Sequence, residues 1–193
     1  MEMKVAVIGA GTMGRGVAQV FAEHDYKVTL VDIKDEILEE ARDSIKQNVR
    51  MRKLFNKNLN LDDTHVMEQL SFTTDLTAVA DADFVIENII ESIEAKESLY
   101  KQLKDICKDE CIFMVNTSCI SITKIGSCMK DASKVIGTHF MNPVPMIDAV
   151  EVMRGFHTSD ETVNRVKELL NSVGKEEIVI QDFPGFVTNR ISH

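Results

Sequence analysis

The stretch VAVIGAGTMG, at residues 5–14, decides how this chain folds. Four apolar residues typical of a buried strand run directly into a glycine-rich turn, and a helical pattern follows. In such a turn Gly9 lets the chain leave the strand, Gly11 lets the backbone approach a pyrophosphate, and Gly14 lets the helix pack closely on the sheet. Amide groups at the helix N-terminus would face the negative charge. The motif therefore predicts a dinucleotide site formed by Gly9, Ala10, Gly11, Thr12, Met13 and Gly14.

A second apolar run, at residues 28–31, ends at Asp32. A carboxylate at this place can accept both hydroxyls of an adenosine ribose and would repel a 2′-phosphate. The sequence therefore favours NAD over NADP as the cofactor, although the nearby Lys34 could tolerate some NADP. The alternative interpretation is an ordinary α/β turn with an acidic strand end.

Composition is that of an ordinary globular protein, with 193 residues, 44% hydrophobic and 27% charged. The net charge of −9 argues against general nucleic-acid binding. We find no apolar run near the roughly 20 residues that cross a bilayer, and no signal peptide. We therefore expect a cytoplasmic protein without a membrane partner. The four cysteines fit no zinc spacing, so we expect buried thiols and no metal site.

Short apolar runs alternate with longer helical patterns along the chain, which predicts an α/β, Rossmann-type doubly wound fold. Its mostly parallel sheet would have helices on both faces. We expect an NAD-binding domain at residues 1–182, and a linker with the start of a helical domain at 183–193. The expected strands are 5–8, 27–31, 71–73, 84–87, 112–116, 135–138, 149–153 and 177–180. The expected helices are 13–23, 35–55, 93–106 and 159–172.

The helix at 35–55 has two distinct faces. Its apolar residues recur every four positions and should pack on the sheet, namely Ile37, Ala41, Ile45 and Val49. Beside them runs a basic stripe of Lys46, Arg50, Lys53 and Lys57. This stripe is either a solvated helix face or a binding site for a phosphorylated ligand.

Small polar residues at 116–118 follow one expected strand, and His139 with Asn142 follows another. The carboxyl ends of parallel strands are where such sheets bind ligands. A histidine there can accept a hydroxyl proton while hydride leaves the same carbon. Glu151 could fix its tautomer and stabilise the imidazolium. A structural histidine is the alternative. We expect the other histidines to be surface residues: His24, His65, His157 and His193.

These same segments resemble the L-3-hydroxyacyl-CoA dehydrogenases, especially the 3-hydroxybutyryl-CoA branch. The similarity runs from VIGAGTMGRGVAQVFA at 7–22 through VDIKDEIL at 31–38, NTSCISIT at 116–123 and GTHFMNPVP at 137–145 to PGFVTNRI at 184–191. The resemblance implies NAD-linked oxidation of a (3S)-3-hydroxyacyl-CoA to the 3-oxoacyl-CoA, reversibly and with short-chain substrates.

The family's residue roles carry over position by position. The resemblance implies that His139 is the base, that Glu151 orients it, and that Ser118 and Asn189 hold the substrate's 3-oxygen. It adds four cofactor contacts, at Glu91, Lys96, Ser118 and Asn142. From the residues alone, Glu91 and Lys96 would be an exposed helix start. The implied coenzyme A contacts are Asn48 with Lys53 or Lys57.

The chain also departs from the family. Asp148 stands where a lysine is common, which could weaken attraction for an anionic substrate. Family members continue into a helical domain that closes the acyl pocket and forms a homodimer, whereas this sequence stops near its expected start. Two alternatives therefore remain: a dehydrogenase of a non-CoA 3-hydroxy acid, such as carnitine or a sugar acid, and a non-catalytic NAD-binding module.

Overall fold

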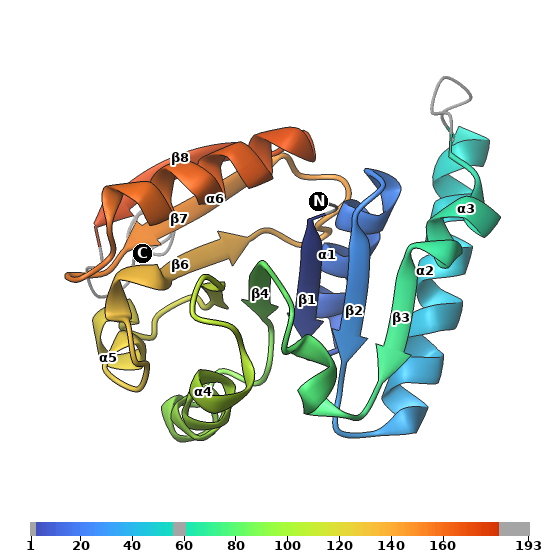
Figure 1. The fold of residues 1–193 in the computed structure, drawn as a ribbon. Coiled ribbons are helices and arrows are strands. Elements are labelled where there is room, and N and C mark those ends of the chain that lie inside the picture. The colour runs from blue at the N-terminus through green and yellow to red at the C-terminus, as the bar shows by residue number, and fades with distance from the viewer. Residues whose placement is uncertain (1–2, 56–60, 182–193) are drawn as a thin grey trace.

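The computed structural model describes residues 3–55 and 61–181 (Figure 1). Within them the strands form an eight-stranded sheet in the order β3-β2-β1-β4-β5-β6-β7-β8. All neighbouring strands are parallel except β6 and β7, which are antiparallel. The strands are β1 (Lys4–Ile8), β2 (Lys27–Val31), β3 (Leu70–Thr73), β4 (Phe84–Glu87), β5 (Ile112–Asn116), β6 (Val135–Phe140), β7 (Ala149–Arg154) and β8 (Glu176–Gln181).

Helices cover both faces of this sheet, which confirms the Rossmann-type doubly wound fold. The helices are α1 (Thr12–Glu23), α2 (Asp35–Phe55), α3 (Asp63–Glu68), α4 (Ile93–Ile106), α5 (Ile122–Gly126) and α6 (Asp160–Ser172). Two 3-10 turns, at Leu76–Val79 and Ala132–Lys134, complete the connections. No helix in the described ranges is both long and apolar enough to cross a membrane.

Alternation along the strands divides the core into two layers. In β1, Val5 and Val7 pack with α1, α2 and α6, whereas Ala6 and Ile8 pack with α4 and α5 on the opposite face. Successive side chains of a strand point to opposite faces, so a strand covered on both sides must be apolar throughout. The continuous apolar run at the start of the sequence reflects this double burial.

Most expected elements form close to their expected bounds, with instructive exceptions. Strand β6 continues to Phe140, so His139 lies within a strand rather than after it. Helices α3 and α5 were not expected, because six and five residues are too few to show a helical period. Each is instead marked by a side-chain N-cap, Asp62 or Ser121.

The expected surface and core positions are largely confirmed. On α2 the buried face begins at Leu38, and Ile37 is only partly buried. His24, His65 and His157 are exposed, as expected, and His193 lies outside the described residues. The expectation of buried thiols holds for Cys107 and Cys111, whereas Cys128 is partly buried. It is wrong for Cys119, which lies in the exposed turn after β5.

A buried ion pair joins β4 to α4. The Lys96 ammonium lies 2.7 and 2.8 Å from the two carboxylate oxygens of Glu87, and both side chains are fully inaccessible. Lys96 also donates to the Asn116 carbonyl at 3.0 Å, and the Ile89 amide donates to Glu87 at 2.7 Å. Burial raises the pKa of Glu87, while the Lys96 ammonium acts in the opposite direction. The pair thus fixes α4 against the ends of β4 and β5.

Replacing Lys96 should expose how much the fold depends on this pair. We expect Lys96→Met to lower the free energy of unfolding by about 3–5 kcal/mol, because it leaves a buried carboxylate without compensation. Urea denaturation followed by circular dichroism measures this. The control Lys124→Met removes a largely exposed ammonium 3.4 Å from Glu97 and should change stability by less than about 1 kcal/mol. Equal effects of the two substitutions on the free energy of unfolding would contradict the stabilising role of the Glu87–Lys96 pair.

The two later glycines of the motif have different structural roles. A Cβ placed on Gly14 would lie 1.7 Å from the Gly9 carbonyl oxygen, whereas one placed on Gly11 would meet no atom within 4 Å. Gly14 is therefore required for α1 to pack on the turn after β1. Gly11 is not required for packing.

This difference gives a matched pair of variants. We expect Gly14→Ala to destabilise the protein by at least about 3 kcal/mol, because backbone must move to admit the methyl group. Gly11→Ala should change stability by less than about 1 kcal/mol. Thermal denaturation of both variants tests this. A Gly14→Ala protein as stable as wild type would contradict the close packing of α1 on the turn after β1.

Candidate active site

The antiparallel pairing of β6 with β7 places His139 directly opposite Glu151. Residues paired in this way on one face of a sheet have side chains within contact distance. The imidazole Nδ1 lies 2.8 Å from Glu151 Oε2. The pairing predicted from the sequence is therefore present, and strand register produces it.

This contact sets the protonation pattern of the imidazole. Glu151 is 3% exposed, and because its carboxylate can only accept, Nδ1 of the imidazole donates to it. The other nitrogen, Nε2, then carries the lone pair. The His139 side chain is 15% exposed, so the ring remains accessible. The arrangement suits a general base that acts through Nε2.

Ser118 approaches the imidazole from the next strand. It follows the end of β5, and its Oγ lies 3.2 Å from His139 Nε2. A substrate oxygen placed near both atoms would lie within reach of the Ser118 hydroxyl group and of the His139 imidazole. Three of the four expected catalytic residues thus converge; the fourth, Asn189, lies outside the described residues.

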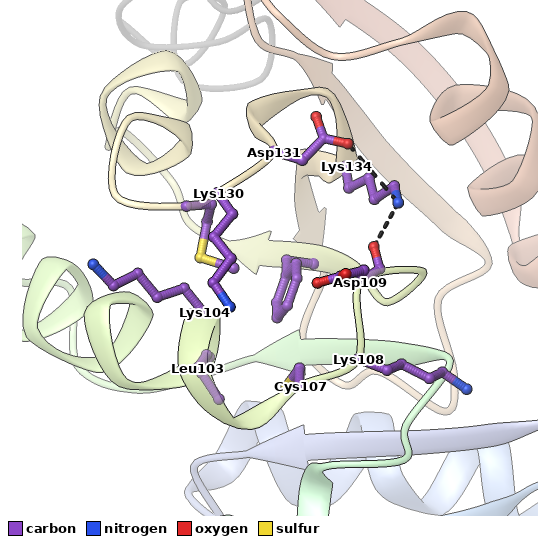
Figure 2. Close-up of a pocket in the computed structure, with 10 residues that line it drawn as sticks. Leu103, Lys104, Cys107, Lys108, Asp109, Lys130, Asp131 and Lys134 are labelled. Atoms are coloured by element: carbon purple, nitrogen blue, oxygen red, sulfur yellow. Dashed lines mark hydrogen bonds and ion pairs between the residues drawn. The ribbon is translucent and has the colours of Figure 1, made fainter.

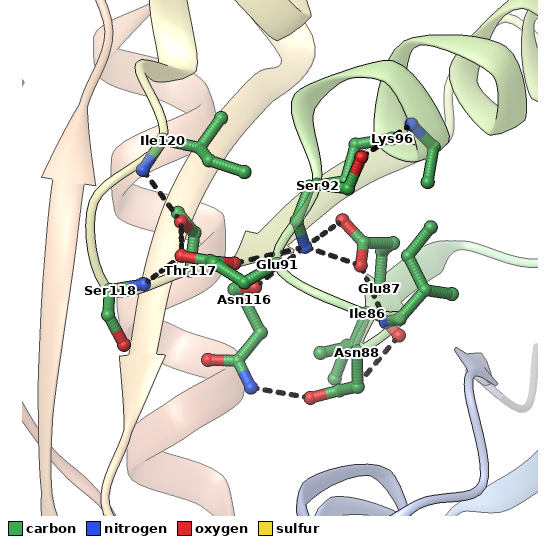
Figure 3. Close-up of polar contacts among 12 residues, drawn as sticks. Ile86, Glu87, Asn88, Glu91, Ser92, Lys96, Asn116, Thr117, Ser118 and Ile120 are labelled. Atoms are coloured by element: carbon green, nitrogen blue, oxygen red, sulfur yellow. Dashed lines mark hydrogen bonds and ion pairs between the residues drawn. The ribbon is translucent and has the colours of Figure 1, made fainter.

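Glu91 holds the turn that carries Ser118 (Figure 3). Its Oε1 accepts hydrogen bonds from the Thr117 hydroxyl, from the Ser118 amide at 2.8 Å and from the Cys119 amide at 3.2 Å. Burial opposes the charge of this carboxylate, but these bonds and the Lys96 ammonium outweigh it and lower the pKa of Glu91. Glu91 therefore anchors the serine as an ionised group.

The expectation of an exposed helix start at Glu91 and Lys96 is wrong for Lys96, which is 0% exposed. Its ammonium is enclosed by Glu87 and the Asn116 carbonyl, and lies 3.8 Å from Glu91 Oε2. Glu91 itself is partly exposed, with a side-chain exposure of 37%. Direct cofactor contacts of these two residues remain predictions.

Asn88 was missed from the sequence, and it pairs with Asn116, which belongs to the polar segment at 116–118 that was expected near the site. Asn116 Nδ2 donates to Asn88 Oδ1 at 2.6 Å, and Asn116 Oδ1 accepts from the Phe140 amide at 3.3 Å. The backbone amide of Asn88 donates to the Ile8 carbonyl at 2.7 Å. These bonds join the carboxyl ends of β1, β4, β5 and β6. The signal that could have found Asn88 is its position directly after the strand that ends at Glu87.

A cavity of about 360 Å³ lies over these strand ends. It brings together five residues that the sequence analysis had selected from distant segments: Met13, Glu91, Ser118, His139 and Asn142. The nicotinamide end of a dinucleotide would have to enter here, because the base is here. The remaining lining residues come from the same loops: Asn88, Ile89, Asn116, Thr117, Phe140 and Met141.

The N-terminus of α1 fits the pyrophosphate of NAD. Gly11 is the N-cap residue and makes no side-chain cap, and the space beside its Cα is open. Ala10 and Asp32 fix the loop, since the Ala10 amide donates to Asp32 Oδ2 at 2.7 Å. A cofactor placed on this loop would have amide donors at its phosphates and a carboxylate at its ribose.

The basic stripe on α2 is only partly available to a ligand. Arg50 Nε lies 2.7 Å from Asp63 Oδ2, so this guanidinium is already paired. Lys46 and Lys53 are exposed, and Lys57 lies outside the described residues. Asn48 lines a second cavity, of about 530 Å³, between α2 and the loop after β6.

A third cavity, of about 340 Å³, lies between α4 and the segment before β6 (Figure 2). Several lysines surround it, but three of them lie near acidic or carbonyl oxygens. Lys134 contacts Asp131 and the Asp109 carbonyl, Lys108 lies 2.6 Å from Asp83, and Lys130 lies 3.8 Å from Asp105. None of the expected site residues, His139 included, lines this cavity.

Comparison with known proteins agrees with this geometry. Residues 4–183 match the family model described as 3-hydroxyacyl-CoA dehydrogenase, NAD binding domain. A probable 3-hydroxybutyryl-CoA dehydrogenase of Deinococcus radiodurans is 44% identical over 98% of this chain and 68% of its own length. The 3-hydroxyadipyl-CoA dehydrogenase of Escherichia coli is 40% identical over 97% of this chain and 40% of its own length.

A solved structure shows the same fold. The crystal structure of 3-hydroxybutyryl-CoA dehydrogenase from Escherichia coli superposes with a TM-score of 0.95 and is 39% identical, covering all of this chain and 41% of its own. This chain thus spans about two-thirds or about two-fifths of the length of these relatives. From the matched family model, the shared fold and the site geometry, the chain belongs to the 3-hydroxyacyl-CoA dehydrogenase family and comprises its NAD-binding domain.

Proposed function

We propose that this chain provides the cofactor site and the catalytic base of an NAD-dependent 3-hydroxyacyl-CoA dehydrogenase. The reaction interconverts a (3S)-3-hydroxyacyl-CoA and the 3-oxoacyl-CoA. The observation that carries the proposal is the arrangement of Glu151, His139 and Ser118 at the edge of a cavity over the sheet. NAD, when bound, supplies the hydride acceptor for the oxidation.

In this proposal, side chains of the protein carry out the proton transfer. Glu151 holds Nδ1–H of His139, so that Nε2 can accept the proton of the substrate's 3-hydroxyl group. The carboxylate stabilises the imidazolium that forms. Ser118 Oγ positions the reacting oxygen, and Asn189 is proposed to do the same. In the reverse direction His139 returns the proton to the 3-oxygen.

The substrate assignment rests on the relatives and on the second cavity. The relatives' names specify hydroxybutyryl-CoA and hydroxyadipyl-CoA, so a short or medium acyl chain is proposed here. Coenzyme A would lie along α2, near Asn48 and Lys53, where apolar and polar side chains together line the second cavity. A cytoplasmic location, and a homodimer formed through a helical domain, belong to the same proposal.

Removing the base should lower turnover without weakening cofactor binding. We expect His139→Ala to reduce kcat for acetoacetyl-CoA reduction by about 10²–10⁴-fold, because no other group would transfer the proton. Glu151→Gln should also reduce kcat strongly, because it disturbs the imidazole tautomer. The rate of NADH consumption measures both effects. NADH affinity, followed by fluorescence, should stay within about threefold of wild type.

The matched control is His157→Ala, which removes an exposed histidine whose ring contacts Phe156 away from the site. Its kcat should equal that of wild type. Turnover by His139→Ala within a few fold of wild type would rule out the proposed base. Binding of NADH without any turnover of acetoacetyl-CoA by the wild-type protein would instead favour the non-catalytic NAD-binding module.

The alternative that the substrate lacks coenzyme A is tested through the exposed part of the basic stripe. We expect the double variant Lys46→Glu/Lys53→Glu to weaken coenzyme A binding at least fivefold, because attraction of the two side chains for phosphate becomes repulsion. Salt screens charges, so the difference from wild type should be smaller at high salt. Titration calorimetry measures this affinity. The control Lys101→Glu/Lys130→Glu changes the net charge equally on exposed residues of another surface. Equal affinities in both double variants would favour a non-CoA substrate.

A further inference from the structure

Lys175 is a buried lysine that the proton-transfer mechanism does not use. It is 3% exposed, and its ammonium donates to the Val144 carbonyl at 2.6 Å and to the Ile147 carbonyl at 2.7 Å. The Asp148 carboxylate is 3.9 Å away but largely exposed. Lysines are rarely buried unless they are paired, so these two carbonyl bonds need an explanation.

Backbone hydrogen bonds of the neighbouring residues fix the position of Lys175. Helix α6 ends at Ser172, and Gly174 adopts a positive φ of 71° that reverses the chain. The Lys175 amide then donates to the Leu170 carbonyl at 3.0 Å. One residue later, the Glu176 amide at the start of β8 donates to the Asp148 carbonyl at 2.9 Å. Lys175 therefore projects from a fixed point.

The segment that Lys175 holds is the loop at residues 141–148, which connects β6 to β7. Its first residues, Met141 and Asn142, line the cavity that contains His139. Its later residues, including Pro145, line the second cavity beside α2. The position of this one loop therefore shapes both the cofactor end and the coenzyme A end of the proposed site.

The loop is also supported from beneath by α1. Val144 is 2% exposed, and a Cβ placed on Gly16 would lie 3.1 Å from Val144 Cβ. The loop is thus held between an apolar contact on α1 and two charge-assisted hydrogen bonds from Lys175. Burial lowers the pKa of Lys175, although the nearby Asp148 carboxylate acts in the opposite direction.

We propose that Lys175 is a positioning residue, whose ammonium fixes the loop so that Asn142 faces the nicotinamide half of the bound cofactor. This inference rests on the proposed function. Lys175 touches neither cofactor nor substrate, and acts through the Val144 and Ile147 carbonyls. The adenosine half of the cofactor would bind at the glycine turn and Asp32, which are not among the contacts of the Lys175 ammonium with Val144, Ile147 and Asp148.

The test compares two ligands that share the adenosine half. NADH carries the nicotinamide ring and ADP-ribose does not. We expect Lys175→Met to weaken NADH binding about tenfold, the effect of one lost polar contact, while ADP-ribose affinity stays within about twofold. Lys175→Gln, which retains a donor, should lie between wild type and Lys175→Met. Titration calorimetry well below the melting temperature gives both affinities.

The matched control is Lys167→Met, which removes a partly exposed ammonium 3.4 Å from Glu177 on the same edge of the sheet. It should leave both affinities unchanged. Equal losses for NADH and ADP-ribose in Lys175→Met, or no loss for either, would overturn the proposal. If Lys175→Met does not fold, the same comparison in Lys175→Gln decides. Failure of the wild-type chain to bind NADH would instead refute the proposed function.

Discussion

The site depends on one antiparallel contact in a sheet that is otherwise parallel. Because β7 returns beside β6, His139 and Glu151 meet across two hydrogen-bonded strands, and the backbone of both fixes their separation. A slip of one residue in this pairing would turn one side chain to the opposite face of the sheet. The orientation of the imidazole is therefore as rigid as the sheet itself. Proton transfer needs such a fixed base, since small displacements greatly reduce its rate.

The surrounding polar groups extend this rigidity to the neighbouring strands. Asn88 and Asn116 join the ends of β1, β4, β5 and β6, and Glu91 holds the turn with Ser118. Beneath them the Glu87–Lys96 pair contacts both Glu91 and the Asn116 carbonyl. A network of this kind is stable only when its members are satisfied, because an unpaired buried charge is strongly destabilising. The site is thus supported by ionised groups that do not themselves face the reacting atoms.

Local patterns in the sequence predict much of this arrangement, and contacts between distant segments account for the rest. The long helices α2 and α4 form at their expected bounds, because many periodic residues define them. The histidine–glutamate pair was predicted as well, although its cause in strand register was not. Lys96 was misjudged because a lysine near a helix start ordinarily faces solvent, and its burial follows only from Glu87 on another element. The partners of Glu91 and Lys175 are likewise remote in sequence, so no local pattern reveals them.

The hydrogen bond from the Ala10 amide to Asp32 has a consequence for how such enzymes diversify. One oxygen of the carboxylate accepts the Ala10 amide of the glycine-rich turn, and in the proposed cofactor site the same group would disfavour a 2′-phosphate. In the proposed site, discrimination between the two nicotinamide dinucleotides and the shape of the glycine-rich turn would thus be coupled through a single side chain. An evolutionary change of coenzyme at this position would require a compensating substitution that restores the lost acceptor. In the proposed site, cofactor preference would therefore be constrained by the architecture of the glycine-rich turn.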